Sequence, residues 1–137
     1  MKYSDWLEEV PNSIKCDALW NTQTYRKALF LSELAWHDCE QLLKHPLGKP
    51  IAHQLIRSSG SVPANIEEGF GRGFGRDYGR FLRIAIGSAR ETRGWYFRGR
   101  KLIAPEVLNH RLQELDAIIA GLVIISRQQS QKKKPTA

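Results

Sequence analysis

Hydrophobic positions recur every three or four residues over most of the chain, which is the spacing of one face of an α-helix. Four long stretches show this spacing, and we expect helices at residues 17–44, 50–70, 76–103 and 106–129. Strand signals are weak, because no stretch sustains an alternation of apolar and polar residues and no Asn-Gly or Asp-Gly hairpin occurs. The pattern therefore predicts an all-α protein.

The breaks between these stretches are short. Proline and glycine interrupt the helical pattern at His45–Gly48, at Gly69–Gly75 and at Ala104–Pro105. Short connections make consecutive helices antiparallel, so the sequence predicts an up-down-up-down four-helix bundle over residues 16–130. Residues 1–15 form an extension in which a short helix is expected at Tyr3–Val10. Residues 131–137 form a polar, basic tail that is expected to be disordered.

Two of the stretches have a defined inward face. In the first stretch the expected inward residues are Tyr25, Leu29, Ser32, Trp36, Cys39 and Leu43. In the third stretch they are Tyr78, Leu82, Ala85, Ala89, Thr92, Tyr96 and Ile103.

The second stretch contains Pro63, which removes a backbone hydrogen bond from a helix interior. Two backbone conformations are compatible with Pro63 at this position. One is a single helix that kinks at Pro63. The other is a helix that ends near Gly60 and restarts with Ser61 as its cap. We favour the single kinked helix.

Positive charge is concentrated in one part of the chain. Residues 72–101 carry nine basic and two acidic side chains, a net charge of +7 that equals the formal net charge of the whole chain. In the third stretch most of these arginines fall opposite the apolar face, so the expected helix has a polar face of nearly one sign. The location of this charge indicates where a partner would bind.

A row of guanidinium groups along one helix suits a phosphate backbone, because each group offers paired donors and stays charged. The residues expected to contact phosphate are Arg76, Arg80, Arg83, Arg90 and Arg98. The residues expected at the margins are Arg72, Arg93, Arg100 and Lys101. Two alternatives remain open: a solvated face, or arginines that pair with glutamates of a neighbouring subunit. The same face could also meet an acidic protein partner in an oligomeric interaction scaffold.

Aromatic residues lie between the basic ones and could stack on unpaired bases. Phe70 and Phe74 in the glycine-rich connection are the better candidates, since Tyr78 and Tyr96 fall on the apolar face. The connection itself is not a nucleotide-binding loop, because no Gly-Lys-Ser/Thr follows it and no strand precedes it. Its glycines are expected to let the chain turn between two helices.

Signals for catalysis, metals and cofactors are weak. Glu67 and Glu68 adjoin each other, but the Glu-x-x-His motif of metal-binding bundles is missing from the sequence. Cys16 and Cys39 lack the CxxC spacing and are expected to be free thiols of a reducing compartment. We therefore expect a non-enzymatic protein without metal or other cofactor.

Size and hydropathy favour a soluble single domain. The chain has 137 residues, of which 42% are hydrophobic and 26% charged, values that are ordinary for a globular protein. Its first ten residues are acidic and lack an apolar run, and no stretch approaches the length of a membrane span. A cytoplasmic location without membrane association is expected.

A specific motif lies in the second stretch and continues in the third. The motif comprises Arg57, Ser61, Val62, Pro63, Asn65, Ile66, Glu68 and Gly69. Residues 78–91, which read YGRFLRIAIGSARE, follow in the third stretch. Together they resemble the four helix bundle protein family, first noticed as proteins encoded in intervening sequences of bacterial 23S ribosomal RNA. The resemblance covers about residues 25–126. After Ser88 many members continue with acidic and leucine-rich residues, whereas this chain is basic there.

The resemblance carries functional implications of its own. The family is related to the accessory variability determinant (Avd) proteins of diversity-generating retroelements, which form homopentameric barrels and assist a reverse transcriptase and its template RNA. This likeness implies a homo-oligomeric ring, with RNA or an RNA–DNA hybrid as ligand and a reverse transcriptase as partner. The natural ligand, its sequence and the oligomer number do not follow from the residues themselves.

Overall fold

The computed structural model describes residues 1–131 of the chain, and all regular structure in that range is helical. The long helices are α3 (Gln23–Leu42), α4 (Gly48–Gly71), α5 (Arg76–Arg98) and α6 (Pro105–Gln131). The short ones are α1 (Tyr3–Glu9), α2 (Asn12–Lys15) and the 3-10 helices η1 (Ala18–Asn21) and η2 (Arg100–Leu102). The predicted all-α class is confirmed. The predicted tail lies outside the described residues, except for Gln131, which ends α6.

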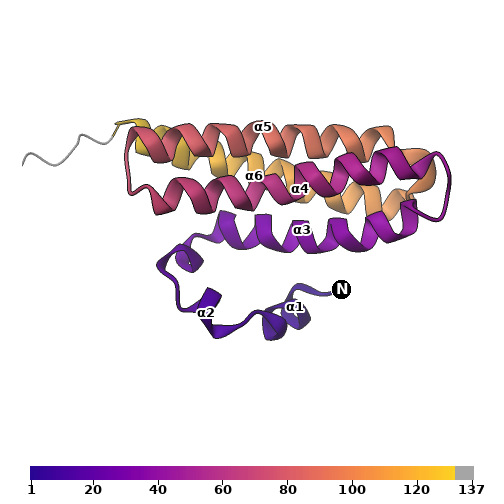
Figure 1. The fold of residues 1–137 in the computed structure, drawn as a ribbon, viewed down its shortest axis with the longest axis horizontal. Coiled ribbons are helices and arrows are strands. Elements are labelled where there is room, and N and C mark those ends of the chain that lie inside the picture. The colour runs from indigo at the N-terminus through magenta and orange to yellow at the C-terminus, as the bar shows by residue number, and fades with distance from the viewer. Residues whose placement is uncertain (132–137) are drawn as a thin grey trace, which may run out of the picture.

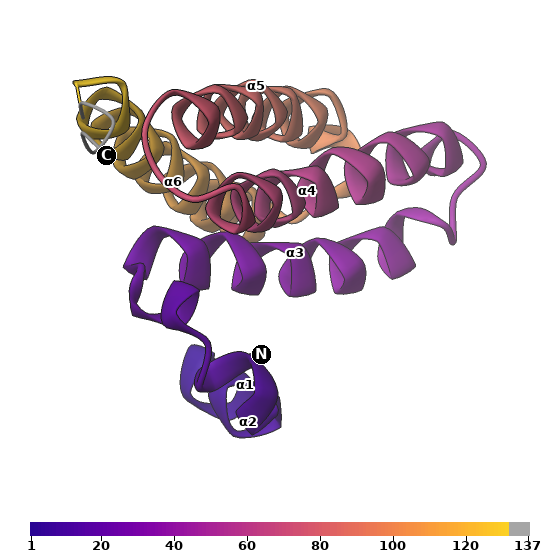
Figure 2. The same ribbon diagram turned by 60° about the vertical axis from the view of Figure 1, so that its left-hand side comes forward.

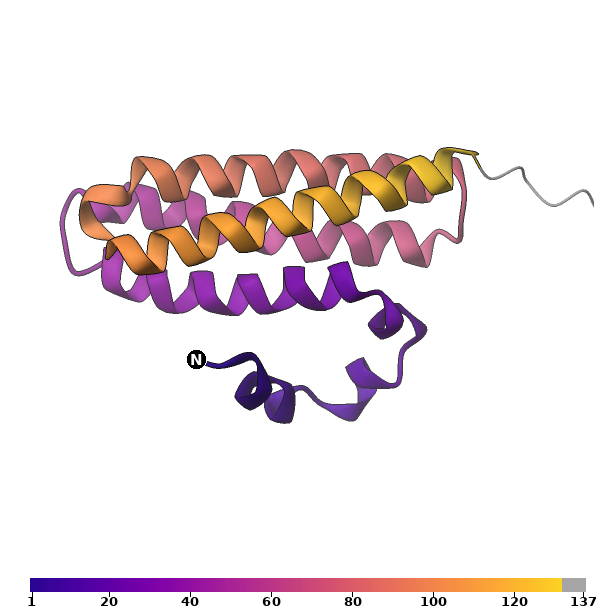
Figure 3. The same cartoon turned by 180° about the vertical axis from the view of Figure 1, so that it is seen from behind.

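The four long helices lie side by side, and each runs in the direction opposite to the one before it (Figure 1). Helix α5 packs along both α4 and α6, while α3 packs mainly on α4. Seen from behind, α6 crosses obliquely over the other long helices (Figure 3). The short N-terminal helices lie beyond α3, on the side away from α5 (Figure 2). Helix α5 therefore has neighbours on two sides and an outer face.

The apolar stripe of α5 is the clearest link between sequence and core. Its six predicted helical positions are buried, namely Tyr78, Leu82, Ala85, Ala89, Thr92 and Tyr96. Ile103 lies past the helix end and is half-buried. Full burial of a large apolar side chain stabilises a fold by about 1.5–3 kcal/mol. The stripe thus fixes which face of α5 points inward.

The predicted inward face of α3 is partly wrong. Trp36 is 59% exposed and Leu43 is also exposed, although both were expected to face inward. The observed face is rotated around the helix axis and centres on Leu31, Ala35 and Leu42. Apolar residues occupy positions 28–31 and 34–36 of the chain, so the apolar spacing alone admits more than one inward face.

Helix α4 runs without interruption from Gly48 to Gly71, with Pro63 buried inside it. The alternative of a break near Gly60 is therefore wrong. The Asn65 side-chain amide donates hydrogen bonds to the Ser61 carbonyl oxygen at 2.8 Å and to Ser61 Oγ at 3.0 Å. These bonds supply extra polar contact in the turn where proline lacks a donor.

The connection from α4 to α5 is a short glycine-rich turn. Gly73 and Gly75 have φ values of 102° and 87°, which glycine adopts without the penalty of a side chain. The buried amide of Gly75 donates to Gln129 Oε1 of α6 at 2.9 Å. The turn is thereby tied to the last helix, and Arg76 becomes the first residue of α5.

The N-terminal segment packs onto α3 through aromatic rings. Trp6 of α1 is buried, with ring centroids 6.1 Å from Trp20 and 5.2 Å from Phe30. Tyr3 meets Phe30 edge to face at 5.2 Å. A short helix predicted at Tyr3–Val10 corresponds to α1.

Candidate nucleic-acid interface

Five arginines form a row along the outer face of α5, and we call this row the arginine strip. All five side chains are exposed, and they are Arg76, Arg80, Arg83, Arg90 and Arg98. They lie opposite the buried stripe because both sets follow the helical repeat. A helix of 23 residues is about 34 Å long, so the strip extends along most of the molecule.

Within residues 1–131 the strip has no close acidic partner, although the Glu91 carboxylate interacts with the charge of Arg98. None of the five arginines forms an ion pair with a described residue, and Arg83 donates one hydrogen bond to Ser130 Oγ at 3.2 Å. Unpaired guanidinium groups on one face create a positive field that attracts anions and weakens with salt.

The residues predicted at the margins of the strip differ in whether they pair with an acidic side chain. Arg72 pairs with Glu68 at 3.0 Å, and Arg93 pairs with Asp116 of α6 at 2.8 Å. Arg100 and Lys101 are exposed in η2, beyond the end of α5. The structure therefore extends the strip at the C-terminal end of α5 and gives Arg72 and Arg93 acidic partners.

Several arginines lie over aromatic rings, a feature that the sequence reasoning did not identify. The guanidinium carbon of Arg98 lies 4.2 Å from the ring centroid of Trp95. That of Arg100 lies 4.3 Å from the Phe97 ring centroid. Arg80 and Arg72 lie 4.7 Å and 5.3 Å from the Phe81 ring centroid. In the sequence, each of these aromatic residues lies one to nine residues from the arginine that contacts its ring, and this proximity was the only available signal of the contacts.

The two predicted stacking residues occupy different environments. Phe70 is half-buried and meets Tyr78 edge to face, with ring centroids 5.9 Å apart. Phe74 is 51% exposed in the turn before α5. Of the two, Phe74 has the freer ring face.

A chain of polar contacts fixes Trp95 at the far end of α5. The Trp95 indole nitrogen donates to Glu91 Oε2 at 2.8 Å, and Arg57 of α4 donates to the same oxygen. The Trp95 hydrogen bond chiefly, and Arg57 in addition, lower the pKa of Glu91. Arg57, the first residue of the sequence motif, thus links α4 to the aromatic end of α5.

A buried polar cluster joins three helices, and no sequence pattern predicts it. Asp38 of α3 accepts hydrogen bonds from Arg111 of α6 at 2.7 Å and 3.1 Å, and from the Tyr96 hydroxyl at 2.6 Å. Burial, with the Asp38 charge, raises the pKa of Tyr96 well above its ordinary value. Each polar group has a partner inside the fold, so the cluster stabilises the structure and offers no free site.

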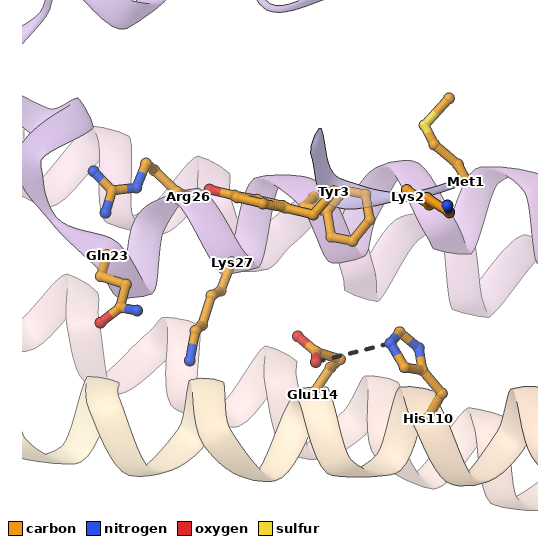
Figure 4. Close-up of a pocket in the computed structure, with 9 residues that line it drawn as sticks. Met1, Lys2, Tyr3, Gln23, Arg26, Lys27, His110 and Glu114 are labelled. Carbon is orange, nitrogen blue, oxygen red and sulfur yellow. Dashed lines mark ion pairs between the residues drawn. The ribbon is translucent and has the colours of Figure 1, made fainter. Parts of the chain in front are cut away.

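A cavity of about 610 Å³ lies between the N-terminal segment, α3 and α6 (Figure 4). Lys27 reaches from α3 toward α6, and His110 and Glu114 reach back from α6. Arg26 already donates to the Trp20 carbonyl oxygen at 2.8 Å, and His110 lies 3.8 Å from Glu114. The cavity therefore offers less free charge than the strip.

The two adjacent glutamates of α4 have separate local partners. Glu67 accepts a hydrogen bond from the Tyr25 hydroxyl at 2.6 Å, and Glu68 pairs with Arg72. Within residues 1–131 no three His, Cys, Asp or Glu side chains gather where they could hold a metal ion. In the same range, no helix combines the length and apolar character that crossing a membrane requires.

Comparison with known proteins identifies the family. The model of the 23S rRNA-intervening sequence protein family matches residues 21–123. The chain belongs to this family. The match covers α3, α4, α5 and most of α6, and leaves α1 and α2 outside. No curated protein matches the chain.

A solved structure shows the same fold. It is the crystal structure of a protein of unknown function from the S23 ribosomal protein family of Bacteroides thetaiotaomicron. Its TM-score is 0.71 at 23% sequence identity, and the match covers 76% of this chain and 98% of that chain. This chain and that protein thus share a fold.

Proposed function

We propose that this protein is a non-catalytic accessory protein that binds RNA or an RNA–DNA hybrid on the arginine strip. The observation that carries the proposal is the row of exposed arginines on α5 without acidic partners among residues 1–131. Guanidinium groups bind phosphate oxygens through paired donors, and counterion release makes such binding favourable. The family name, which refers to ribosomal RNA, is compatible with an RNA ligand.

The proposal includes an assembly. In it, α3 to α6 are an up-down-up-down four-helix bundle, and several protomers form a homo-oligomeric ring, a pentamer by likeness to the accessory variability determinant proteins. The same likeness supports a reverse transcriptase as partner. A ring would present several strips to one nucleic acid, which raises the effective concentration of binding groups.

The first test is a charge-neutralised variant. We expect Arg80→Gln, Arg83→Gln and Arg90→Gln together to weaken binding of labelled RNA, DNA and hybrid at least tenfold, irrespective of sequence. The slope of log affinity against log salt should fall in magnitude by roughly 2–3, because about three phosphate contacts are lost. Fluorescence anisotropy over a salt series measures both quantities.

The matched control removes the same charge elsewhere. Lys2, Lys44 and Lys49 are exposed and lie outside α5, so their combined change to Gln should leave most of the binding intact. Equal loss in both triple variants would show a response to net charge alone. Absence of saturable binding by the unmodified protein near physiological salt would refute the proposal and favour an acidic protein as the partner of the strip.

A further inference from the structure

Exposed aromatic rings lie at both ends of the arginine strip. Phe97, in the last turn of α5, is 54% exposed, and Phe74, just before the first turn, is 51% exposed. Phe97 has no role in the core, because the buried face of α5 ends at Tyr96 on the other side. Surfaces that bind single strands combine exposed aromatic rings with cationic side chains, and this end of α5 has both.

The end of α5 that carries Phe97 is organised before any ligand binds. Arg100 lies over the Phe97 ring, and Arg98 lies over the Trp95 ring. Trp95 is in turn held by Glu91, which Arg57 of α4 also contacts. Rings and guanidinium planes fixed in this way require little ordering when a flat base stacks against them.

Resting on the function proposed above and narrowing its ligand from RNA or a hybrid to a single strand, we propose that the strip binds single-stranded nucleic acid, with unpaired bases stacked on Phe97 and Phe74 while the arginines hold the phosphates. Bases in a duplex already stack on each other, so their faces are not available to these rings. A single strand exposes both bases and phosphates, which matches the two kinds of group on this surface.

The placement of α5 also disfavours the usual duplex mode. A helix that reads a duplex enters the major groove, about 12 Å wide, and must project from its protein. Helix α5 packs along α4 on one side and α6 on the other, with seven buried residues distributed over its length. Only its outer face is free, which suits a strand lying along the surface.

The length of the strip sets a size for the ligand. Helix α5 is about 34 Å long, so about ten nucleotides cover it at 3.4 Å per nucleotide, the spacing along one strand of a duplex, and fewer cover it when the strand is extended. A strand of twelve nucleotides can reach both rings and all five arginines, whereas a strand of four cannot.

The test compares a labelled uridine 12-mer, a 12-base-pair RNA duplex and an abasic sugar-phosphate 12-mer at one salt concentration. We expect the uridine strand to bind at least fivefold more tightly than the other two. Phe97→Leu should lower its affinity about fivefold or more, with the salt slope unchanged because no charge is removed. Trp36→Leu, a matched change of an exposed aromatic on α3, should have no effect.

The outcomes separate this inference from the function on which it rests. If the duplex or the abasic strand binds as tightly as the uridine strand, or if Phe97→Leu binds normally, single-strand stacking is refuted and binding to the strip stands. If no nucleic acid binds, both proposals fail. Circular dichroism of each variant verifies that it is folded before its affinity is compared.

Discussion

Asp38 is a carboxylate in the core, and its surroundings show how the fold accepts a buried charge. Arg111 binds both of its oxygens, and the Tyr96 hydroxyl binds one of them. Removing a single partner from such a cluster leaves an uncompensated charge and costs about 3–5 kcal/mol. The cluster thus depends on all three side chains together.

The two cysteines should differ sharply in reactivity. Burial, with the neighbouring Asp38 charge, raises the pKa of Cys39 to about 11, and its thiol donates to the Ala52 carbonyl oxygen at 3.4 Å. Cys16 is exposed. At pH 8 we expect iodoacetamide to label one thiol of the native protein and both after unfolding, since the thiolate is the reactive form. Peptide mapping by mass spectrometry identifies the labelled residue.

The control is Cys16→Ser, which should abolish labelling of the native protein. The sign of the pH effect follows from the raised pKa: Cys39 stays protonated at pH 8 and becomes reactive in the fold only as the pH approaches 11. Rapid labelling of Cys39 at neutral pH would show that α3 opens locally.

Residue burial was predictable where apolar and small side chains recur at one helical spacing. The α5 stripe from Tyr78 to Tyr96 is the example, because its spacing admits one inward face. Asp38 was not predictable, since a charged residue is assigned to the surface unless its partner is known. That partner, Arg111, is 73 residues away and shows no local signal.

At the scale of elements, the family motif mainly describes how α4 meets α5. Ser61 Oγ lies 3.0 Å from Ser88 Oγ, and the Thr92 hydroxyl donates to Ser58 Oγ at 2.9 Å. A Cβ on Gly69 would lie 2.7 Å from Phe81 Cβ. Small side chains and a glycine thus let the two helices approach closely, so the motif is a signature of packing more than of chemistry.

Two glycines of α4 provide a matched pair for testing this packing. Gly69→Ala should destabilise the protein by about 1–3 kcal/mol, the usual cost of overpacking. A Cβ on Gly60 would have no neighbouring atom within 4 Å. Gly60→Ala should therefore stabilise the protein by up to about 1 kcal/mol, because alanine favours a helix interior more than glycine does. Urea unfolding followed by circular dichroism measures both, and stabilisation by Gly69→Ala would disprove the close contact.

The positions of the helices were predicted better from the sequence than the contacts between them. Helix α4 continues through Pro63 as favoured, whereas α3 begins at Gln23 and α5 ends at Arg98, where bounds at 17 and 103 were expected. The rotation of α3 was missed because apolar residues occupy positions 28–31 and 34–36, so the apolar spacing admits more than one inward face.

At the scale of the whole molecule, charge location was predictable and charge pairing was not. Formal charges are read directly from the sequence, and the helical repeat puts the arginines of the strip on one face. The pairing of Arg93 with Asp116 depends on how α5 lies against α6. The arginine-aromatic contacts at Trp95 and Phe97 likewise required coordinates, because a ring on a basic helix can turn inward or outward.

The bond between Asp38 and Arg111 joins the first and last long helices across 73 residues, which bears on folding kinetics. Contacts between sequence neighbours such as α4 and α5 close small loops and should form early, whereas this one closes a large loop. We expect Arg111→Met to speed unfolding by roughly 200- to 5,000-fold and to leave the refolding rate nearly unchanged. Stopped-flow chevron plots distinguish the two rates, and slower refolding would place this long-range contact in the folding nucleus. The ion pair between α3 and α6 would then slow unfolding. It would determine how long the folded chain persists more than how quickly the fold forms.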